Sequence, residues 1–106
     1  MSKLFPAVFL LVIGSLASAS VHNIKMNSIG YDPKKIEIRS GDSVEWTNAA
    51  YTEHSATFSD TAEKYDTGLI QPKKTSKKIE FSRAGNFPYH CSVHGKTMSG
   101  EIVVKP

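Results

Sequence analysis

The chain has 106 residues, one cysteine and a formal net charge of +3 that is spread along its length. A charge this weak and scattered argues against nucleic-acid binding, which favours a concentrated basic stripe. The single cysteine excludes an intramolecular disulfide, and the sequence contains no P-loop, glycine-rich dinucleotide turn or internal repeat. These features predict one small domain with a modest hydrophobic core.

The first nineteen residues differ in character from the rest of the chain. Lys3 is followed by an uncharged apolar run over residues 4–16 and then by the small residues Ala17-Ser18-Ala19. This order is typical of a secretory signal, and the run is shorter than the roughly twenty residues of a membrane-spanning helix. We therefore expect a signal peptide over residues 1–19, a mature domain over residues 20–106, and a periplasmic or secreted protein. The alternative, an uncleaved membrane anchor, is disfavoured by the Ala-x-Ala site.

Beyond residue 19 no helical period extends over ten residues, and short segments instead alternate apolar with polar side chains. The apolar pairs are Ile24 and Met26, Ile36 and Ile38, Val44 and Trp46, Ile79 and Phe81, Phe87 and Tyr89, and Ile102 and Val104. Turn residues rich in Gly, Asp, Asn and Ser separate them, which predicts an all-β domain, an antiparallel sandwich or barrel. Residues 49–71 are the least regular and predict a long connection.

Residues 77–82 and 86–91 flank a short turn, and we expect them to pair as an antiparallel hairpin. Cys91 would then lie at the far end of the second strand. Lys73 and Lys74, at the start of the first strand, would lie at that same end. The hairpin thus predicts a basic cluster beside Cys91.

The segment that points to chemistry contains Cys91, His94 and Met98. A tight loop can turn Cys91 and His94 toward one metal ion, and a thioether follows four residues later. Thiolate, imidazole and thioether are the ligands of copper electron-transfer sites, in which two histidines and a cysteine form a plane and methionine binds weakly along the axis. A second histidine is therefore required from elsewhere.

Three histidines are candidates for that ligand. His90 is adjacent to Cys91 in a strand and points to the opposite face, and His22 is close to the predicted mature terminus. His54 opens an extended segment after the strand that carries Trp46, and it is the best candidate. In the mature chain, Ser20-Val21-His22 would offer an amine, two amides and an imidazole for square-planar Cu(II) or Ni(II), although an ordinary strand role for His22 is the simpler interpretation.

Two other chemistries compete for the Cys-x-x-His pattern. Structural zinc usually takes four protein ligands, commonly from two Cys-containing pairs, and this chain has one cysteine. A nucleophilic Cys91 paired with His94 or His54 would indicate a thiol hydrolase, but a domain of this size offers little room for a substrate cleft. A merely structural cysteine leaves the clustering of Cys, His and Met unexplained.

The chain resembles the plastocyanin/azurin family of cupredoxins over nearly the whole length of the predicted domain. The residues that carry the resemblance are Tyr31-Asp32-Pro33, Ile36, Ile38, Gly41, Asp42, Val44, Trp46, Asn48, His54, Gly68-Leu69, Pro72, Gly85, Phe87, Tyr89, Cys91, His94, Met98 and Gly100. The resemblance implies a Greek-key β-sandwich of seven or eight strands with one type 1 copper ion at one end. It places His54, Cys91, His94 and Met98 at the four ligand positions, and implies a small soluble one-electron carrier rather than an enzyme.

Two departures from the family pattern concern the metal site. Gly95, Lys96 and Thr97 separate His94 from Met98, whereas relatives with this loop more often have two or four residues there. Ser55 also follows His54 where many relatives have Asn. We expect Ser55 to offer its backbone N–H to the Cys91 sulfur and its hydroxyl to the loop near Ser92, because such bonds orient metal ligands.

The resemblance implies that the edge of His94 faces solvent and serves as the exit for electrons. We expect redox partner proteins to dock near His94, with Lys73, Lys74 and Lys96 attracting acidic partners, and we expect a monomer. His90 resembles the exposed aromatic position beside the cysteine in plastocyanins, although a surface histidine without a role is the simpler interpretation. The alternative function is a copper carrier or buffer that transfers or stores the ion.

Overall fold

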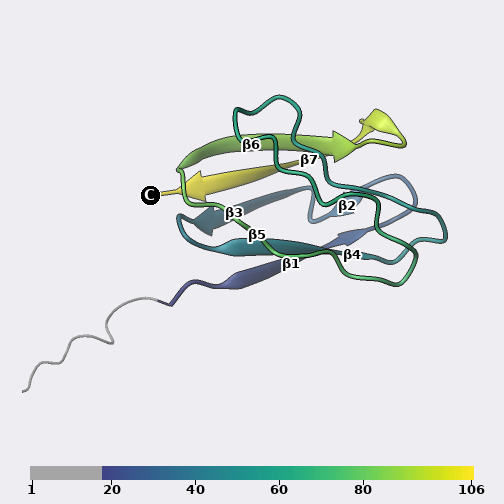
Figure 1. Cartoon of the computed structure of the whole chain (residues 1–106), viewed down its shortest axis with the longest axis horizontal. Helices are drawn as coiled ribbons and strands as arrows, with labels where there is room; N and C mark the ends of the chain where they lie inside the picture. The colour runs from purple at the N-terminus through teal and green to yellow at the C-terminus, as the bar shows by residue number, and fades with distance from the viewer. Residues whose placement is uncertain (1–17) are drawn as a thin grey trace, which may run out of the picture.

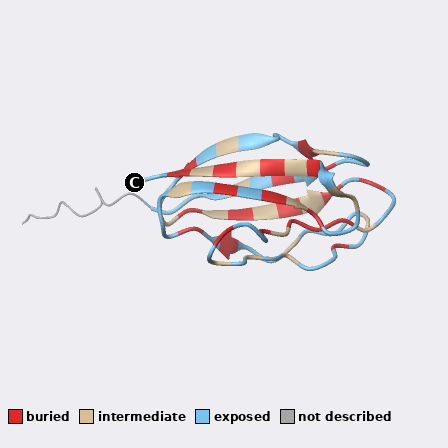
Figure 2. Ribbon diagram, turned by 90° about the horizontal axis from the view of Figure 1, so that it is seen from above, coloured by how far each residue is buried: buried red, intermediate tan, exposed pale blue. Residues whose placement is uncertain are grey.

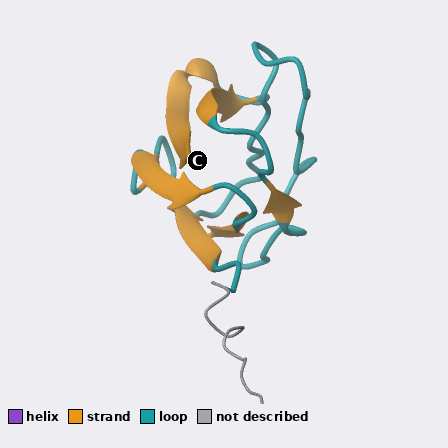
Figure 3. Cartoon of the chain, turned by 90° about the vertical axis from the view of Figure 1, so that its left-hand side faces the viewer, coloured by secondary structure: helices purple, strands orange, loops and turns teal. Residues whose placement is uncertain are grey.

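The structure is a computed structural model that describes residues 18–106, and none of these residues is in a helix (Figures 1 and 3). Its strands are β1 (Val21–Met26), β2 (Tyr31–Asp32), β3 (Lys35–Arg39), β4 (Ser43–Asn48), β5 (Ile79–Glu80), β6 (Gly85–Cys91) and β7 (Gly95–Lys105). Within this range no segment is a helix long and apolar enough to cross a membrane. The predicted signal peptide lies almost entirely outside the described residues.

The strands form two sheets that pack face to face, which confirms the expected all-β sandwich (Figure 1). One sheet has the order β2-β1-β4-β5 and the other has the order β3-β7-β6. The β1–β2, β4–β5 and β6–β7 pairs are antiparallel, whereas β1 pairs with β4 and β3 pairs with β7 in parallel. The expectation of a purely antiparallel sandwich is therefore wrong for these two pairs, because the chain changes sheets between the partners.

Alternation along each strand builds the core, as Figure 2 shows by the buried bands along the strands. In β4 the residues Val44, Trp46 and Asn48 are buried, and their neighbours in the strand are only partly covered. Trp46 lies at the centre of a group of aromatic rings, with ring centroids 6.0 Å from Phe58 and 5.5 Å from Tyr89 in edge-to-face arrangements. Edge-to-face packing is a favoured geometry for aromatic pairs. The Trp46–Tyr89 contact joins the two sheets, and the Trp46–Phe58 contact joins β4 to the connection that follows it.

The expected hairpin of residues 77–82 with 86–91 is wrong. β5 pairs with β4 and β6 pairs with β7, so the chain crosses from one sheet to the other between β5 and β6 (Figure 1). Phe81, just after β5, still forms a hydrogen bond with the residue before β4: its N–H donates to the Asp42 carbonyl at 2.9 Å. Phe81 and Phe87 nevertheless meet in the core, with ring centroids 5.4 Å apart. Alternation identifies only the buried face, and both arrangements bury the same faces.

Between β4 and β5 the chain runs without a named strand, as the irregular composition of residues 49–71 led us to expect. Isolated β-bridges attach it to the sandwich: Thr47–Thr75, His54–Ile70, Thr57–Asp66 and Thr57–His90. The buried Asn48 side chain adds two further bonds, donating its amide N–H groups to the carbonyls of Thr52 at 2.8 Å and Ile70 at 2.9 Å. The connection is thereby fixed at the end of β4, where it carries His54.

Candidate metal centre

Cys91 is the last residue of β6, and its side chain is fully buried. The register of β6 against β7 shifts between His90 and Cys91, and Cys91 then pairs with Gly95. This pairing makes the loop that carries His94 very short. Gly95 has a φ of +66°, a left-handed conformation that side-chain-bearing residues rarely adopt, so the glycine permits this tight return into β7.

The structure brings three of the four predicted ligands together. The Sγ atom of Cys91 lies 3.7 Å from Nδ1 of His54 and 3.7 Å from Nδ1 of His94. One ligand atom from each residue lies within 4.8 Å of the other two. His54 comes from the long connection and the other two residues come from the β6–β7 loop, so the tertiary fold creates the cluster.

These distances fit a metal ion held between the three side chains. Bonds of about 2.3 Å to sulfur and about 2.0–2.1 Å to imidazole nitrogen, meeting near 120°, would separate sulfur and nitrogen by about 3.8 Å. The separations to both histidines are close to that value. The cluster contains one soft cysteine sulfur and two imidazoles, with a thioether nearby in sequence, and this donor set suits one type 1 copper ion.

His54 is held in place through its backbone. Its backbone pairs with Ile70, with the Ile70 N–H donating to the His54 carbonyl at 2.7 Å. Burial lowers the pKa of the His54 imidazole, and the neighbouring His94 lowers it further. The ring is therefore neutral near pH 7 and has a lone pair available for a metal. Its buried Nε2 atom has no hydrogen-bond partner among the described residues.

Ser55 ties the two ligand-bearing segments to one another. Its hydroxyl oxygen accepts a hydrogen bond from the Ser92 N–H at 2.9 Å and donates to the Ser92 hydroxyl at 3.0 Å. The expectation that this hydroxyl reaches the loop near Ser92 is confirmed. The Tyr31 hydroxyl also donates to the Ser55 carbonyl from within the core. The expected bond from the Ser55 N–H to the Cys91 sulfur stays a prediction.

One branch of this network was not predicted from the sequence. The Thr57 hydroxyl lies 2.9 Å from the Ser55 hydroxyl and donates to the Asp66 carboxylate at 3.2 Å. Thr57 also forms a bridge with His90, directly before Cys91. The alternation of Ser55 and Thr57 along one extended segment was the only sequence signal for a shared face.

Met98 lies within β7 and is 1% exposed, in the same core cluster as Cys91. The three-residue segment before it is compact, since the Thr97 hydroxyl donates to the His94 carbonyl at 2.7 Å. Met98 is thus buried immediately beyond the ligand loop, and its role as an axial ligand stays a prediction.

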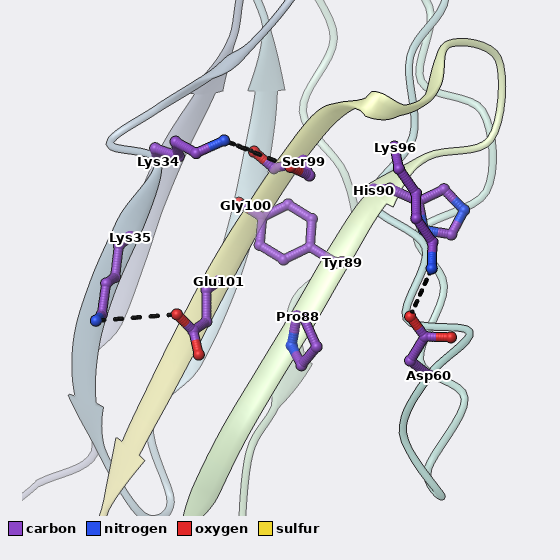
Figure 4. Close-up of a pocket in the computed structure, with 10 residues that line it drawn as sticks. All are labelled: Lys34, Lys35, Asp60, Pro88, Tyr89, His90, Lys96, Ser99, Gly100 and Glu101. Carbon is purple, nitrogen blue, oxygen red and sulfur yellow. Dashed lines mark hydrogen bonds and ion pairs between the residues drawn. The ribbon is translucent and has the colours of Figure 1, made fainter.

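A groove lies beside the metal centre on the outer face of β6 and β7 (Figure 4). Gly100 and Tyr89 both line the groove, and the glycine allows the Tyr89 ring to pack closely against β7. A Cβ atom at Gly100 would lie only 2.6 Å from this ring. Lys96 forms one wall with Asp60, to which its ammonium donates at 3.0 Å. His90 also lines the groove, as expected for a side chain on the face opposite Cys91. None of the three clustered residues lines it, so it is distinct from the metal centre.

Lys73 and Lys74, the basic cluster predicted from the hairpin, lie next to the end of β4 and are not part of a hairpin with β6. The Lys73 N–H donates to the Asn48 carbonyl at 2.7 Å, and the Asn48 N–H donates to the Lys74 carbonyl at 2.9 Å. Asn48 in turn binds the Ile70 carbonyl beside His54. Both lysines are exposed next to the segment that holds His54.

His22 has a structural partner far from this cluster. Its Nε2 atom lies 3.0 Å from the Asp42 carboxylate, and the Ser20 backbone N–H donates to the same carboxylate at 2.9 Å. One of the four nitrogens that a square-planar site at Ser20-Val21-His22 would need, the Ser20 nitrogen, is therefore engaged by Asp42, and the same carboxylate holds the His22 ring. This arrangement favours the interpretation of His22 as an ordinary residue of β1.

Comparison with known proteins connects the fold and the cluster to a family. The profile of the cupredoxin-like domain matches residues 3–104. A chloroplast plastocyanin from Tetradesmus obliquus is 30% identical over 102 aligned residues, covering 83% of this chain and 70% of that protein. Amicyanin from Paracoccus denitrificans is 29% identical, covering 71% of this chain and 58% of that protein.

Solved structures show the same fold. An amicyanin variant aligns with a TM-score of 0.72 at 21% identity, covering 79% of this chain and 81% of that one. A copper-containing nitrite reductase from Thermus scotoductus aligns with a TM-score of 0.73 at 26% identity, but this chain spans only 22% of it. With its two-sheet sandwich, its Cys91–His94 loop and a family profile that matches nearly its whole length, the chain belongs to the cupredoxin-like domain family.

Proposed function

We propose that this protein is a blue copper protein that carries single electrons, with His54, Cys91 and His94 as its strong ligands and Met98 as a weak axial ligand. The observation that carries the proposal is the placement of two imidazole Nδ1 atoms, each 3.7 Å from one buried sulfur. Plastocyanin and amicyanin, the relatives with the most similar sequences described above, support electron transfer as the activity.

A bound copper ion would supply the redox chemistry by alternating between Cu(II) and Cu(I). The protein contributes ligand positions that do not depend on the ion. His54 is fixed by its pairing with Ile70, and the Cys91 loop is fixed by the Ser55–Ser92 bonds. Ligands that are already fixed need little rearrangement when the charge of the ion changes, and this favours rapid electron transfer.

His94 provides the connection to the surface. Its side chain is partly exposed, whereas His54 and Cys91 are fully buried. The adjacent Val93 is 55% exposed, and Leu69, next to the residue that pairs with His54, is 52% exposed. We propose that a redox partner docks over this apolar rim near His94, with Lys73, Lys74 and Lys96 adding attraction for acidic partners. The predicted signal sequence supports a periplasmic or secreted protein, and we propose that it is a monomer.

The alternative is a copper carrier or buffer that transfers or stores the ion. A carrier benefits from ligands that a recipient protein can reach. Burial of His54 and Cys91 limits such access and therefore favours retention of copper and transfer of electrons. The nitrite reductase shares only this domain, and we propose a carrier rather than an enzyme.

The test is the visible spectrum of the purified protein after addition of Cu(II). A thiolate ligand at Cys91 gives an intense charge-transfer band, which Cys91→Ser should abolish while Ser92→Ala leaves it in place. Repeated chemical oxidation and reduction should bleach and restore the band without release of copper to a Cu(I) chelator. A colourless Cu(II) complex would refute the blue copper site, and loss of copper in each cycle would favour the carrier.

A further inference from the structure

Asp42 is a buried carboxylate at the opposite end of the sandwich from the metal centre. It lies just before β4, whereas Asn48 is the last residue of that strand and the His54 segment follows it. Its side chain accepts three hydrogen bonds: from the Ser20 N–H at 2.9 Å, from His22 Nε2 at 3.0 Å and from the Arg39 N–H at 3.1 Å. Asp42 therefore fastens the beginning of β1 to the β3–β4 turn.

We propose that the Asp42 carboxylate is the binding site for the α-amino group that is released when the chain is cleaved between Ala19 and Ser20. Processing would thus create an ion pair that the uncleaved chain lacks, and this pair would anchor the new amino terminus to the folded domain. The proposal extends the signal peptide predicted from the sequence and does not depend on the bound metal.

The position of Ser20 fits this role. Ser18, Ala19 and Ser20 are exposed and precede the first strand, so the bond between Ala19 and Ser20 is accessible to a protease. Ser20 is held on both sides, because its nitrogen binds Asp42 and its carbonyl accepts the Ser43 N–H at 2.9 Å. Among the described residues, every strand, core side chain and candidate ligand lies after this bond. Cleavage here would leave the domain intact.

Hydrolysis changes the chemistry of the donor. Water adds across the Ala19–Ser20 peptide bond, giving a carboxylate on Ala19 and an amine on Ser20. The amine is protonated at neutral pH, since an α-amino group has an unperturbed pKa of about 7.7–8.0. A neutral amide donor at the Asp42 oxygen then becomes an ammonium, and such charge-assisted bonds are roughly twice as strong.

The surroundings are compatible with a positive charge at this point. A surface hollow of about 420 Å³ next to Asp42 is lined by Glu37, Arg39 and Lys105. Glu37 and Lys105 pair with one another at 3.7 Å, and Arg39 is exposed with its backbone N–H bound to Asp42. The three hydrogen bonds hold the pKa of Asp42 near 2, so this carboxyl is ionised at neutral pH. His22 is the remaining titratable group in contact with it.

The pair has a characteristic pH dependence. Because folding favours the protonated amine, the added stability is present below the unfolded pKa of the amine, about 7.7–8.0. It disappears as the pH rises and the folded amine loses its proton. A loss of stability above pH 8 therefore indicates that the Ser20 α-amino group has lost its proton.

The experiment starts from the full chain, expressed with its leader, exported and purified without copper. Intact mass should show a protein that begins at Ser20. Its melting temperature is then compared at pH 7 and pH 9.5 with that of a protein carrying one extra alanine before Ser20, which displaces the amine but keeps Asp42. We expect the native terminus to melt about 4–8 °C higher at pH 7 and to lose that advantage at pH 9.5.

Asp42→Asn removes the carboxylate. Made in both the native and the alanine-extended protein, it completes a double-mutant cycle. The extra alanine should then have little effect on the melting temperature, because the amine has no partner to lose. A mature protein that begins at another residue, or equal melting temperatures for the native and extended termini at pH 7, would overturn the proposal. Should Asp42→Asn fail to fold, the comparison of native and extended termini decides alone. The readout is stability without copper, so it is independent of the proposed electron transfer.

Discussion

The hydroxyl of Ser55 lies 2.9 Å from the backbone nitrogen of Ser92 and so joins the residue after His54 to the residue after Cys91. The two segments are far apart in the sequence, and this side chain helps to fix their separation together with the Thr57–His90 bridge. Ser55 is 1% exposed, so solvent cannot easily replace the bond. The spacing of the candidate ligands is therefore set by the protein itself.

Replacing Ser55 with alanine should loosen that spacing. We expect a loss of about 1 kcal/mol in the free energy of unfolding, because the Ser92 N–H loses its acceptor. The copper protein should also show a shifted midpoint potential and visible band. Ser92→Ala is the matched control, since it removes only the second hydroxyl and should have a smaller effect. Equal potentials for wild type and Ser55→Ala would show that the bond is structural alone.

Met98→Leu tests the axial position. Leucine has a similar volume, so a buried exchange should cost less than about 1.5 kcal/mol of stability. The intense colour should persist, because Cys91 and the two histidines are unchanged. The midpoint potential should rise, since removal of an axial donor disfavours Cu(II). A potential and spectrum identical to wild type would assign Met98 to packing and leave the axial position without a thioether.

The exposed lysines beside the His54 segment make an electrostatic prediction. Lys73→Glu with Lys74→Glu should slow electron transfer with a negatively charged inorganic complex, measured by stopped-flow spectroscopy at low salt. The effect should weaken toward 0.15 M salt, where the Debye length is about 8 Å. Lys77→Glu with Lys78→Glu makes the same charge change nearer the start of β4 and should slow the reaction less. Equal slowing by both pairs of substitutions would show that the reaction depends on the net charge of the protein and not on the position of these lysines.

Gly100→Ala should destabilise the sandwich. The added Cβ would lie 2.6 Å from the Tyr89 ring and 2.9 Å from the Lys34 carbonyl, so strand or ring must move. Overpacking of this kind typically costs about 1–3 kcal/mol, which urea denaturation measures. Gly30→Ala is the matched control, because nothing lies within 4 Å of its Cβ position. Similar unfolding midpoints for the two variants would contradict the tight approach of Tyr89.

Asp42 also predicts a stability change in acid. Its hydrogen bonds, first among them the one from the Ser20 N–H, lower its pKa from 3.8 to about 2. A depressed carboxyl pKa gives stability that is fully present above the unfolded value and is lost as the pH falls through the folded value. The stability difference between wild type and Asp42→Asn should therefore shrink between about pH 4 and pH 2. A difference that stays constant across this window would show that Asp42 acts without its charge.

Local patterns in the sequence predicted the parts of this molecule that are local in space. The Cys91–His94 loop is short, so its residues meet for any fold that places them in a turn. Alternation identified the buried faces of β4 and β6 because a strand exposes its two faces in turn. These features required no knowledge of which strands are neighbours.

Pairing between distant segments could not be read in the same way. Phe81 and Phe87 occupy one core whether β5 and β6 form a hairpin or belong to different sheets, so the pattern does not distinguish the two. The contacts of Asn48 with Ile70, and of Thr57 with Asp66, depend on the path of a connection that has no periodicity. Sequence separation, rather than residue type, limited the prediction.

The parallel pairing of β3 with β7 has a consequence for the order in which the molecule forms. β7 is the last strand among the described residues, and it pairs both with β3, which comes much earlier in the sequence, and with β6. Contacts of such long range make folding comparatively slow, on the order of milliseconds to seconds. Cys91 ends β6, His94 lies just before β7 and Met98 lies within β7, so the cluster forms only after both strands have been synthesised.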